Sequence, residues 1–218
     1  MNIDNIFLAI EIIGTIAFAI TGVITALEKK FDIFGAIVLG TVTAVGGGIV
    51  RDLILGYLPP MAFRKSIYAI TAVVTSLVVF IIAYFLGDKI KKHFDVYSQI
   101  INVFDSIGLS VFVVGGVNSA IACGFEENMF LSIFVAVLTG VGGGIMRDIM
   151  AGRVPKILRK RVYALAAIIG SLIYYILIHY SVCSSTLAIV FGAGSVLIIR
   201  ILATIFHWNL PTVKNLGE

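Results

Sequence analysis

Seven apolar runs, each long enough to cross a bilayer as a helix, fill nearly the whole of this 218-residue chain. A membrane-spanning helix needs about 20 mostly apolar residues. Because 60% of the residues are hydrophobic and only 13% are charged, polar side chains are too few to cover a soluble globule. The sequence therefore predicts an all-α integral membrane protein with seven transmembrane helices. These are Ile6–Leu27, Ile33–Leu58, Ile67–Leu86, Ile100–Ala122, Met129–Val154, Val162–Tyr180 and Ser185–Phe206.

The basic residues predict the orientation of the chain. The first of them is Lys29, so the first run lacks the basic start of a signal peptide and is expected to be retained. With the N-terminus outside, most Lys and Arg residues fall on the cytoplasmic side, as the positive-inside rule requires, and the C-terminus is cytoplasmic. That inner set is Lys29, Lys30, Lys89, Lys91, Lys92, Arg147, Arg153, Lys156, Arg159, Lys160, Arg161 and Lys214. Only Arg51, Arg64 and Lys65 fall outside, and no basic stripe alternates with aromatics, so nucleic acid is not an expected partner.

An internal repeat divides the chain. The stretch GGGIVRDLILGYLP from Gly46 returns as GGGIMRDIMAGRVP from Gly142, 96 residues later, and EIIGTIAFAITG from Glu11 aligns with DSIGLSVFVVGG from Asp105. Each half is a three-span unit, and because three is odd the second half enters the membrane with inverted topology. We expect a first repeat with its inner loop over residues 1–97, a second repeat over 98–183, and a seventh helix with the C-terminal tail over 184–218.

Glycine triplets lie near the middle of the second span of each half, at Gly46, Gly47 and Gly48 and at Gly142, Gly143 and Gly144. An interior glycine costs about 1 kcal/mol relative to alanine in a helix, so a kink or a break is expected there. Stripes of small residues, Gly40-Ala44-Gly48 and Ala136-Gly140-Gly144, indicate instead close helix packing. Packing leaves three consecutive glycines unexplained, whereas a kink that exposes carbonyl groups to a polar path would explain them.

An Arg-Asp pair follows each triplet. Charged side chains at membrane depth usually face a bundle interior or an aqueous cavity. Because adjacent helical residues do not face each other, we expect pairing across the axis of the repeat, Arg51 with Asp148 and Arg147 with Asp52. The alternative is that the arginines extend toward the lipid headgroups.

Acidic residues occupy equivalent positions in the first span of each half, Glu11 and Asp105. They are expected to line a shared cavity or to lie at its outer and inner mouths. A role of the two carboxylates in proton relay is one alternative. No His, Cys and carboxylate cluster has metal-ligand spacing, so neither a metal nor a cofactor is expected. His179 near Ser181 is the one pair considered for hydrolysis, and its place at a span end favours an interfacial cap, so an enzyme is not expected.

The duplicated GGGIxRDxxxGxxP motif, the inverted three-span repeats and the seventh helix together resemble the bacterial trimeric intracellular cation (TRIC) channels. The resemblance implies a homotrimer in a prokaryotic inner membrane, surrounded by lipid. Each protomer would hold its own pore between kinked second and fifth transmembrane helices and conduct monovalent cations, potassium above all. It places the six triplet glycines at the kinks, with Arg51, Asp52, Arg147 and Asp148 nearby.

Two points limit the transfer from this family. Animal relatives carry a lysine-containing motif on the second helix that binds phosphoinositide, and here glycine and valine stand at that point, so lipid regulation is not carried over. Prokaryotic relatives are also associated with glycine uptake. The alternative function is therefore a small-amino-acid transporter, in which broken-helix ends would bind the substrate carboxylate and ammonium. Continuous conductance and saturable uptake distinguish the two.

Overall fold

The computed structural model describes residues 3–90, 94–159, 162–206 and 208, and every regular element within these ranges is a helix. Lys91, Lys92, Lys160, Arg161 and Lys214, which the orientation prediction used, lie outside them. Within the described ranges, seven helices are long and apolar enough to span a membrane, as predicted. They are α1 (Ile3–Glu28), α2 (Ile33–Ile54), α4 (Ile67–Ile90), α5 (Phe94–Ala122), α6 (Met129–Met150), α8 (Val162–His179) and α9 (Ser185–Ile205). Two single-turn helices, α3 (Met61–Arg64) and α7 (Lys156–Arg159), were not predicted.

Local sequence sets where α2 and α6 begin and end. The side chains of Asp32 and Asn128 cap their first turns by accepting hydrogen bonds from the backbone N–H groups of Gly35 and Leu131. The predicted spans to Leu58 and Val154 were too long, since α2 ends at Ile54 and α6 at Met150. Gly56 and Gly152 follow with φ of +70° and +65°, the left-handed conformation that commonly ends a helix and that glycine adopts without steric cost.

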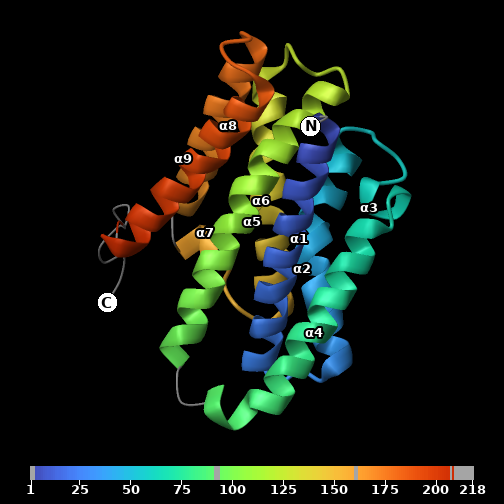
Figure 1. Ribbon diagram of the computed structural model, residues 1–218, viewed down its shortest axis with the longest axis vertical. Coiled ribbons are helices and arrows are strands. Elements are labelled where there is room, and N and C mark those ends of the chain that lie inside the picture. The colour runs from blue at the N-terminus through green and yellow to red at the C-terminus, as the bar shows by residue number, and fades with distance from the viewer. Residues whose placement is uncertain (1–2, 91–93, 160–161, 207, 209–218) are drawn as a thin grey trace, which may run out of the picture.

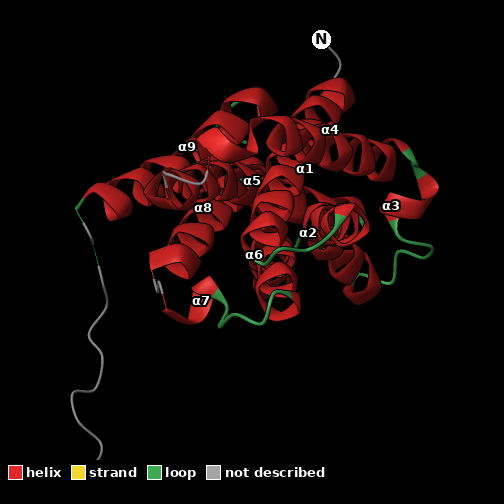
Figure 2. Cartoon of the chain, turned by 90° about the horizontal axis from the view of Figure 1, so that it is seen from below, coloured by secondary structure: helices red, strands yellow, loops and turns green. Residues whose placement is uncertain are grey.

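The two halves pack in the same way and meet along two seams. In the first half α1 packs against α2 and α4, and in the second α5 packs against α6 and α8. The halves join where α1 lies beside α5 and α2 lies beside α6, as Figure 1 shows at the centre of the bundle. Helix α9 packs mainly against α8 and α5, so it covers the second half. Seen from below, α8 and α9 lie at one side of the bundle and α3 at the other (Figure 2).

Small residues bring the helices of each half together. A Cβ atom on Gly22 of α1 would lie 2.6 Å from the Cα atom of Gly40, and one on Gly116 of α5 would lie 2.5 Å from the Cα atom of Ala136. Gly22 and Gly116 are equivalent in the repeat, so the same contact forms twice. The packing interpretation of the small-residue stripes is confirmed at Gly40 and Ala136.

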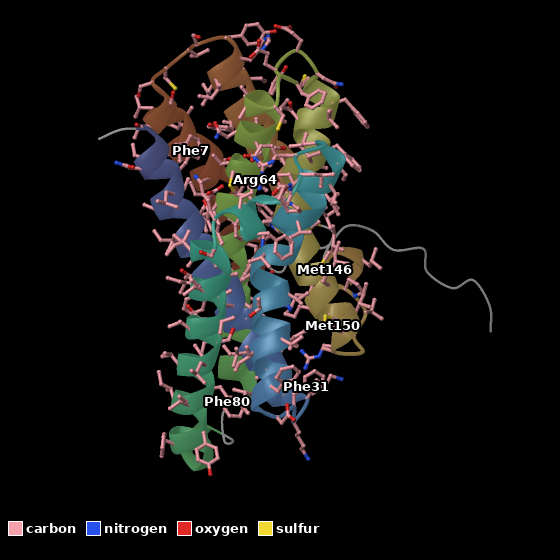
Figure 3. The ribbon with its side chains drawn as sticks, turned by 90° about the vertical axis from the view of Figure 1, so that its right-hand side faces the viewer. Phe7, Phe31, Arg64, Phe80, Met146 and Met150 are labelled. Carbon is pink, nitrogen blue, oxygen red and sulfur yellow. The ribbon has the colours of Figure 1, made fainter. Side chains whose placement is uncertain are left out.

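The outer surface is apolar, as a lipid environment requires. Along α4 the side chains of Ile70, Val74, Val78 and Ile82 are each about half exposed. Figure 3 shows side chains projecting outward along the length of the helices. Large apolar side chains exposed along a whole helix indicate contact with lipid rather than water.

Candidate functional site

The glycine triplets lie where α2 crosses α6. Both helices remain α-helical through the triplets, so the expected break is absent from this conformation, and the kink stays a prediction. A Cβ atom on Gly47 would collide with the carbonyl oxygen of Thr139, and one on Gly143 would collide with that of Thr43. The two contacts are reciprocal, because Gly47 and Gly143 are equivalent, as are Thr43 and Thr139. The middle glycines therefore let two backbones touch near the axis of the repeat.

The outer glycines of each triplet have different neighbours. Gly142 faces the backbone of Gly47, at 3.2 Å from its added Cβ, whereas Gly46 faces the flexible side chain of Met146. Gly48 and Gly144 face away from the crossing, toward the guanidinium groups of Arg51 and Arg147. In each triplet, the middle glycine allows close packing of the two helices. The last glycine leaves space for the neighbouring arginine side chain. This accounts for the middle and last glycines of each triplet without a break in the helix.

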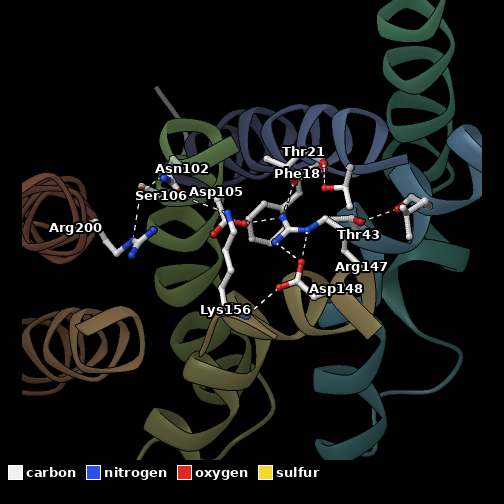
Figure 4. A network of polar contacts seen from close by, with 12 residues as sticks. Phe18, Thr21, Thr43, Asn102, Asp105, Ser106, Arg147, Asp148, Lys156 and Arg200 are labelled. Carbon is white, nitrogen blue, oxygen red and sulfur yellow. Dashed lines mark hydrogen bonds and ion pairs between the residues drawn. The ribbon is translucent and has the colours of Figure 1, made fainter. Parts of the chain in front are cut away.

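Arg147 is the centre of a buried polar cluster in the second half (Figure 4). Its Nη1 lies 2.8 Å from the Asp105 carboxylate and 2.9 Å from the Thr21 hydroxyl, and its Nη2 lies 2.9 Å from the Asp148 carboxylate. The guanidinium group therefore joins α1, α5 and α6. Such a buried cation is stable only with ionic and hydrogen-bond partners of this kind.

Further cations surround this second cluster. Lys156 Nζ donates to the Asn102 side chain at 3.1 Å. Arg200 of α9 donates through Nε to the Ser106 hydroxyl at 3.2 Å, and its guanidinium carbon lies 4.4 Å from the centre of the Tyr163 ring. Three cations therefore gather around two carboxylates. Because α9 has no counterpart in the first half, Arg200 makes the second cluster more positive than the first.

The equivalent cluster in the first half is more open. The Tyr68 hydroxyl donates to the Glu11 carboxylate, and Arg51 donates through Nε to Asp52 at 2.8 Å. Among the described residues, Asp52 is the one hydrogen-bond and ion-pair partner of the Arg51 guanidinium group. A cavity of about 40 Å³ lies here, lined by Glu11, Thr15, Ala44, Val45, Gly48, Arg51, Asp52, Met61, Ala62, Tyr68 and Phe112. The corresponding space beside Arg147 measures about 10 Å³.

The expected pairing across the axis is wrong. Arg51 pairs with its neighbour Asp52, and Arg147 pairs with its neighbour Asp148. Both arginines lie in the last turn of their helices, and their long side chains fold back onto the adjacent carboxylate. Extension toward the headgroups is also wrong, because Arg51 is only 6% exposed and Arg147 only 1%.

The two aspartates also fix the chain that follows each helix. The second carboxylate oxygen of Asp52 accepts from the backbone N–H of Met61 at 2.7 Å, and that of Asp148 accepts from the backbone N–H of Lys156 at 2.9 Å. Met61 and Lys156 are the first residues of α3 and α7. The Arg-Asp motif therefore holds a short helix beside each polar cluster.

An apolar barrier separates the two clusters. One face of α1 carries Glu11, Thr15, Phe18 and Thr21 in turn. The ten residues from Glu11 to Thr21 correspond to about 15 Å along the helix axis. Between them, the ring of Phe18 lies 5.2 Å from the ring of its equivalent Phe112 on α5. These rings lie beside the α2–α6 crossing, since an added Cβ on Gly143 would lie 3.2 Å from Phe18. In this conformation the polar clusters are not continuous.

Sequence reasoning identified the two Arg-Asp pairs, Glu11 and Asp105, but missed the cations Lys156 and Arg200 and the hydroxyl of Thr21. Thr21 and Arg200 contact the second cluster from helices distant in sequence. Arg200 carried a signal, since it is a charge within a span. Thr21 carried none, because its contact is visible only once α1 and α6 are packed.

Comparison with known proteins places the chain in a family. A family model described as "Glycine transporter" matches residues 8–84 and again 102–179, once in each half. The UPF0126 inner membrane protein YadS of Escherichia coli K12 is 37% identical over 204 residues, which cover 93% of this chain and 94% of YadS. The UPF0126 membrane protein YvgT of Bacillus subtilis is 35% identical over 202 residues, with coverage of 93% and 94%.

Solved structures of TRIC channels have the same fold. A structure reported on conductance through TRIC cation channels superposes with a TM-score of 0.82 at 37% identity and covers 96% of this chain and 98% of that one. The TRIC orthologue from Rhodobacter sphaeroides gives 0.83 at 28% identity, with coverage of 93% and 99%. Together with the seven spans and the inner-membrane relatives, these matches describe a multi-pass inner-membrane protein. The chain therefore belongs to the family described as "Glycine transporter" and is a relative of the TRIC cation channels.

Proposed function

We propose that this protein is a monovalent cation channel, permeable to potassium, with one path in each protomer of a homotrimer. The likeness to TRIC cation channels along nearly the whole chain carries the proposal. The same likeness argues against an enzymatic function for this protein. Within the chain, two polar clusters on a shared α1–α5 seam supply the charged and hydroxyl groups that a cation path needs.

The proposed path passes from the Glu11 cavity to the Arg147 cluster, alongside the crossing of α2 and α6. In this conformation it is closed by Phe18 and Phe112 and by the Arg147 ion pairs. Opening would require α2 and α6 to bend at their triplets, where glycine makes bending least costly. The six triplet glycines are thus proposed as hinges that keep the helices close in the closed state.

A small-amino-acid transporter is the second candidate, and one observation favours it. Arg51, which pairs with Asp52 alone among the described residues, lines the same cavity as the carboxylate of Glu11. A guanidinium group can bind a carboxylate through two parallel hydrogen bonds, and a carboxylate can bind an ammonium group. The family model's description, "Glycine transporter", agrees with such a substrate.

Purified protein in liposomes separates the two candidates. Potassium efflux down a gradient and uptake of radiolabelled glycine are measured on the same preparation, with protein-free liposomes as the control. We expect rapid potassium flux that does not saturate and no glycine uptake above the control. Saturable glycine uptake without potassium flux would establish the transporter instead.

We also propose an outside N-terminus and a cytoplasmic C-terminus. The proposal follows from the basic residues near the proposed inner ends of α1 and α6, where Arg153 pairs with Glu28 at 2.6 Å. In this orientation the loops that follow α5 and α8 lie outside, and each of them contains one of the natural cysteines, Cys123 and Cys183.

Labelling of one natural cysteine tests the orientation. In a Cys123→Ser background, we expect a membrane-impermeant thiol reagent added to intact spheroplasts to label Cys183, because the loop after α8 faces outward. A variant that lacks both cysteines is the control for background labelling. Labelling of Cys183 only after the inner face is exposed would reverse the orientation.

A further inference from the structure

Each polar cluster contains an Arg-Asp pair and a carboxylate at equivalent positions of the repeat, but the hydrogen bonds of these groups differ. In the second half Arg147 binds the carboxylate of α5, Asp105. In the first half the corresponding carboxylate of α1, Glu11, binds Tyr68, and Arg51 lines the cavity without bonding to Glu11. The space beside the arginine falls from about 40 Å³ in the first cluster to about 10 Å³ in the second. The two clusters thus differ in how closely the arginine and the first-helix carboxylate are joined and in the space beside them.

We propose that the clusters are two gates of one path, with the Arg147 gate shut and the Arg51 gate open in this conformation. We further propose that the Thr21 hydroxyl sets this bias. The first gate shuts when Arg51 moves its terminal nitrogens onto Glu11, as Arg147 does on Asp105. This inference rests on the proposed function for its flux readout and on the internal repeat for its geometry.

The gates differ at several positions, among them Glu11 against Asp105 and the additional cations Lys156 and Arg200 of the second cluster. One of these differences, Thr21 in place of Gly115, supplies a hydroxyl partner to Arg147. The Thr21 hydroxyl donates to the carbonyl of Phe18 at 2.9 Å and accepts from Arg147 Nη1 at 2.9 Å, so it supports the closed second gate directly. Gly115 offers no such group to Arg51. A Cβ atom added to Gly115 would lie 3.4 Å from a Glu11 carboxylate oxygen, so a side chain there would reach the first gate.

Removing the hydroxyl should loosen the second gate. Thr21→Val keeps the side-chain shape but loses a hydrogen bond from a charged donor, and we expect potassium flux to rise by roughly tenfold. Thr25→Val is the matched control, because Thr25 is equally buried one turn away and its hydroxyl donates to the Thr21 carbonyl rather than to the cluster. Equal fluxes in the two variants would overturn the role of Thr21.

Adding the hydroxyl should shut the first gate. Gly115→Thr supplies Arg51 with the partner that Thr21 gives Arg147, so we expect a flux several-fold below that of Gly115→Ala. The alanine variant carries the same Cβ atom without the hydroxyl and corrects for size. If threonine and alanine reduce flux alike, steric filling explains the result and the proposed closure is wrong.

Chemical modification of an introduced cysteine tests the two gates independently of potassium flux. Thr15 lines the open cavity, so Thr15→Cys in a background with Cys123→Ser and Cys183→Ser reports access to the first gate. We expect a small water-soluble methanethiosulfonate to modify it, and to do so several-fold more slowly with Gly115→Thr than with Gly115→Ala. If Gly115→Thr slows the modification but the wild-type protein passes no potassium, the two gates are supported and the proposed channel function is wrong. Equal modification rates would reject the gates even if the protein conducts.

Discussion

Gly143→Ala is expected to destabilise the protein more than Gly144→Ala, its neighbour in the same triplet. The added Cβ atom at 143 meets the backbone carbonyl of Thr43, which no rotamer change can move, so α2 and α6 must separate. Overpacking of this kind costs about 1–3 kcal/mol. At 144 the nearest atoms belong to side chains at 3.6–3.8 Å, and alanine favours the helix by about 1 kcal/mol. Thermal unfolding in detergent measures the difference.

The first half provides an independent copy of this comparison. Gly47→Ala should lower the unfolding temperature, because its added Cβ meets the Thr139 carbonyl, and Gly48→Ala should not. A pattern in which the last glycine of each triplet is as sensitive as the middle one would contradict the proposed division of roles. It would favour an opening motion that involves the whole triplet.

Arg147→Met is expected to be the most destabilising charge substitution in the chain. It removes the cation from Asp105 and Asp148, and the second oxygen of Asp105 is buried and already lacks a hydrogen-bond partner among the described residues. Removing one partner of a buried ion pair costs about 3–5 kcal/mol, because the remaining charge is left uncompensated. The equivalent Arg51→Met should cost less, since the Arg51 ion pair with Asp52 lies beside an open cavity.

A rescue variant tests this explanation. If the cost arises from stranded carboxylates, adding Asp105→Asn to Arg147→Met should recover part of the lost unfolding temperature. No recovery would show that Arg147 stabilises the bundle through packing rather than through charge. Because Glu11 bonds Tyr68 rather than Arg51, adding Glu11→Gln to Arg51→Met should recover less of the unfolding temperature than Asp105→Asn recovers.

The sequence was sufficient to predict the spans, because membrane length and apolar composition fix them together. It was insufficient for the ends of α2 and α6, where the apolar pattern continues past Gly56 and Gly152 although the helices stop before them. The error in charge pairing has a similar cause. The rule that adjacent helical residues point apart neglects the length of arginine, whose Nε reaches the next side chain in both repeats.

The repeat predicted which residues are equivalent but not how their surroundings differ. Glu11 and Asp105 occupy equivalent positions, yet only Asp105 bonds the arginine of its cluster. The difference depends on contacts between distant segments, such as Thr21 of α1 and Arg200 of α9 with the second cluster. Local sequence carries no record of such contacts.

The most direct test of the proposed cation channel is a current recording from purified protein in a planar bilayer with unequal potassium chloride concentrations on the two sides. Discrete current steps that reverse near the potassium equilibrium potential are the predicted result. Reversal near the chloride potential, or the absence of any steps from protein that accumulates glycine in liposomes, would contradict it.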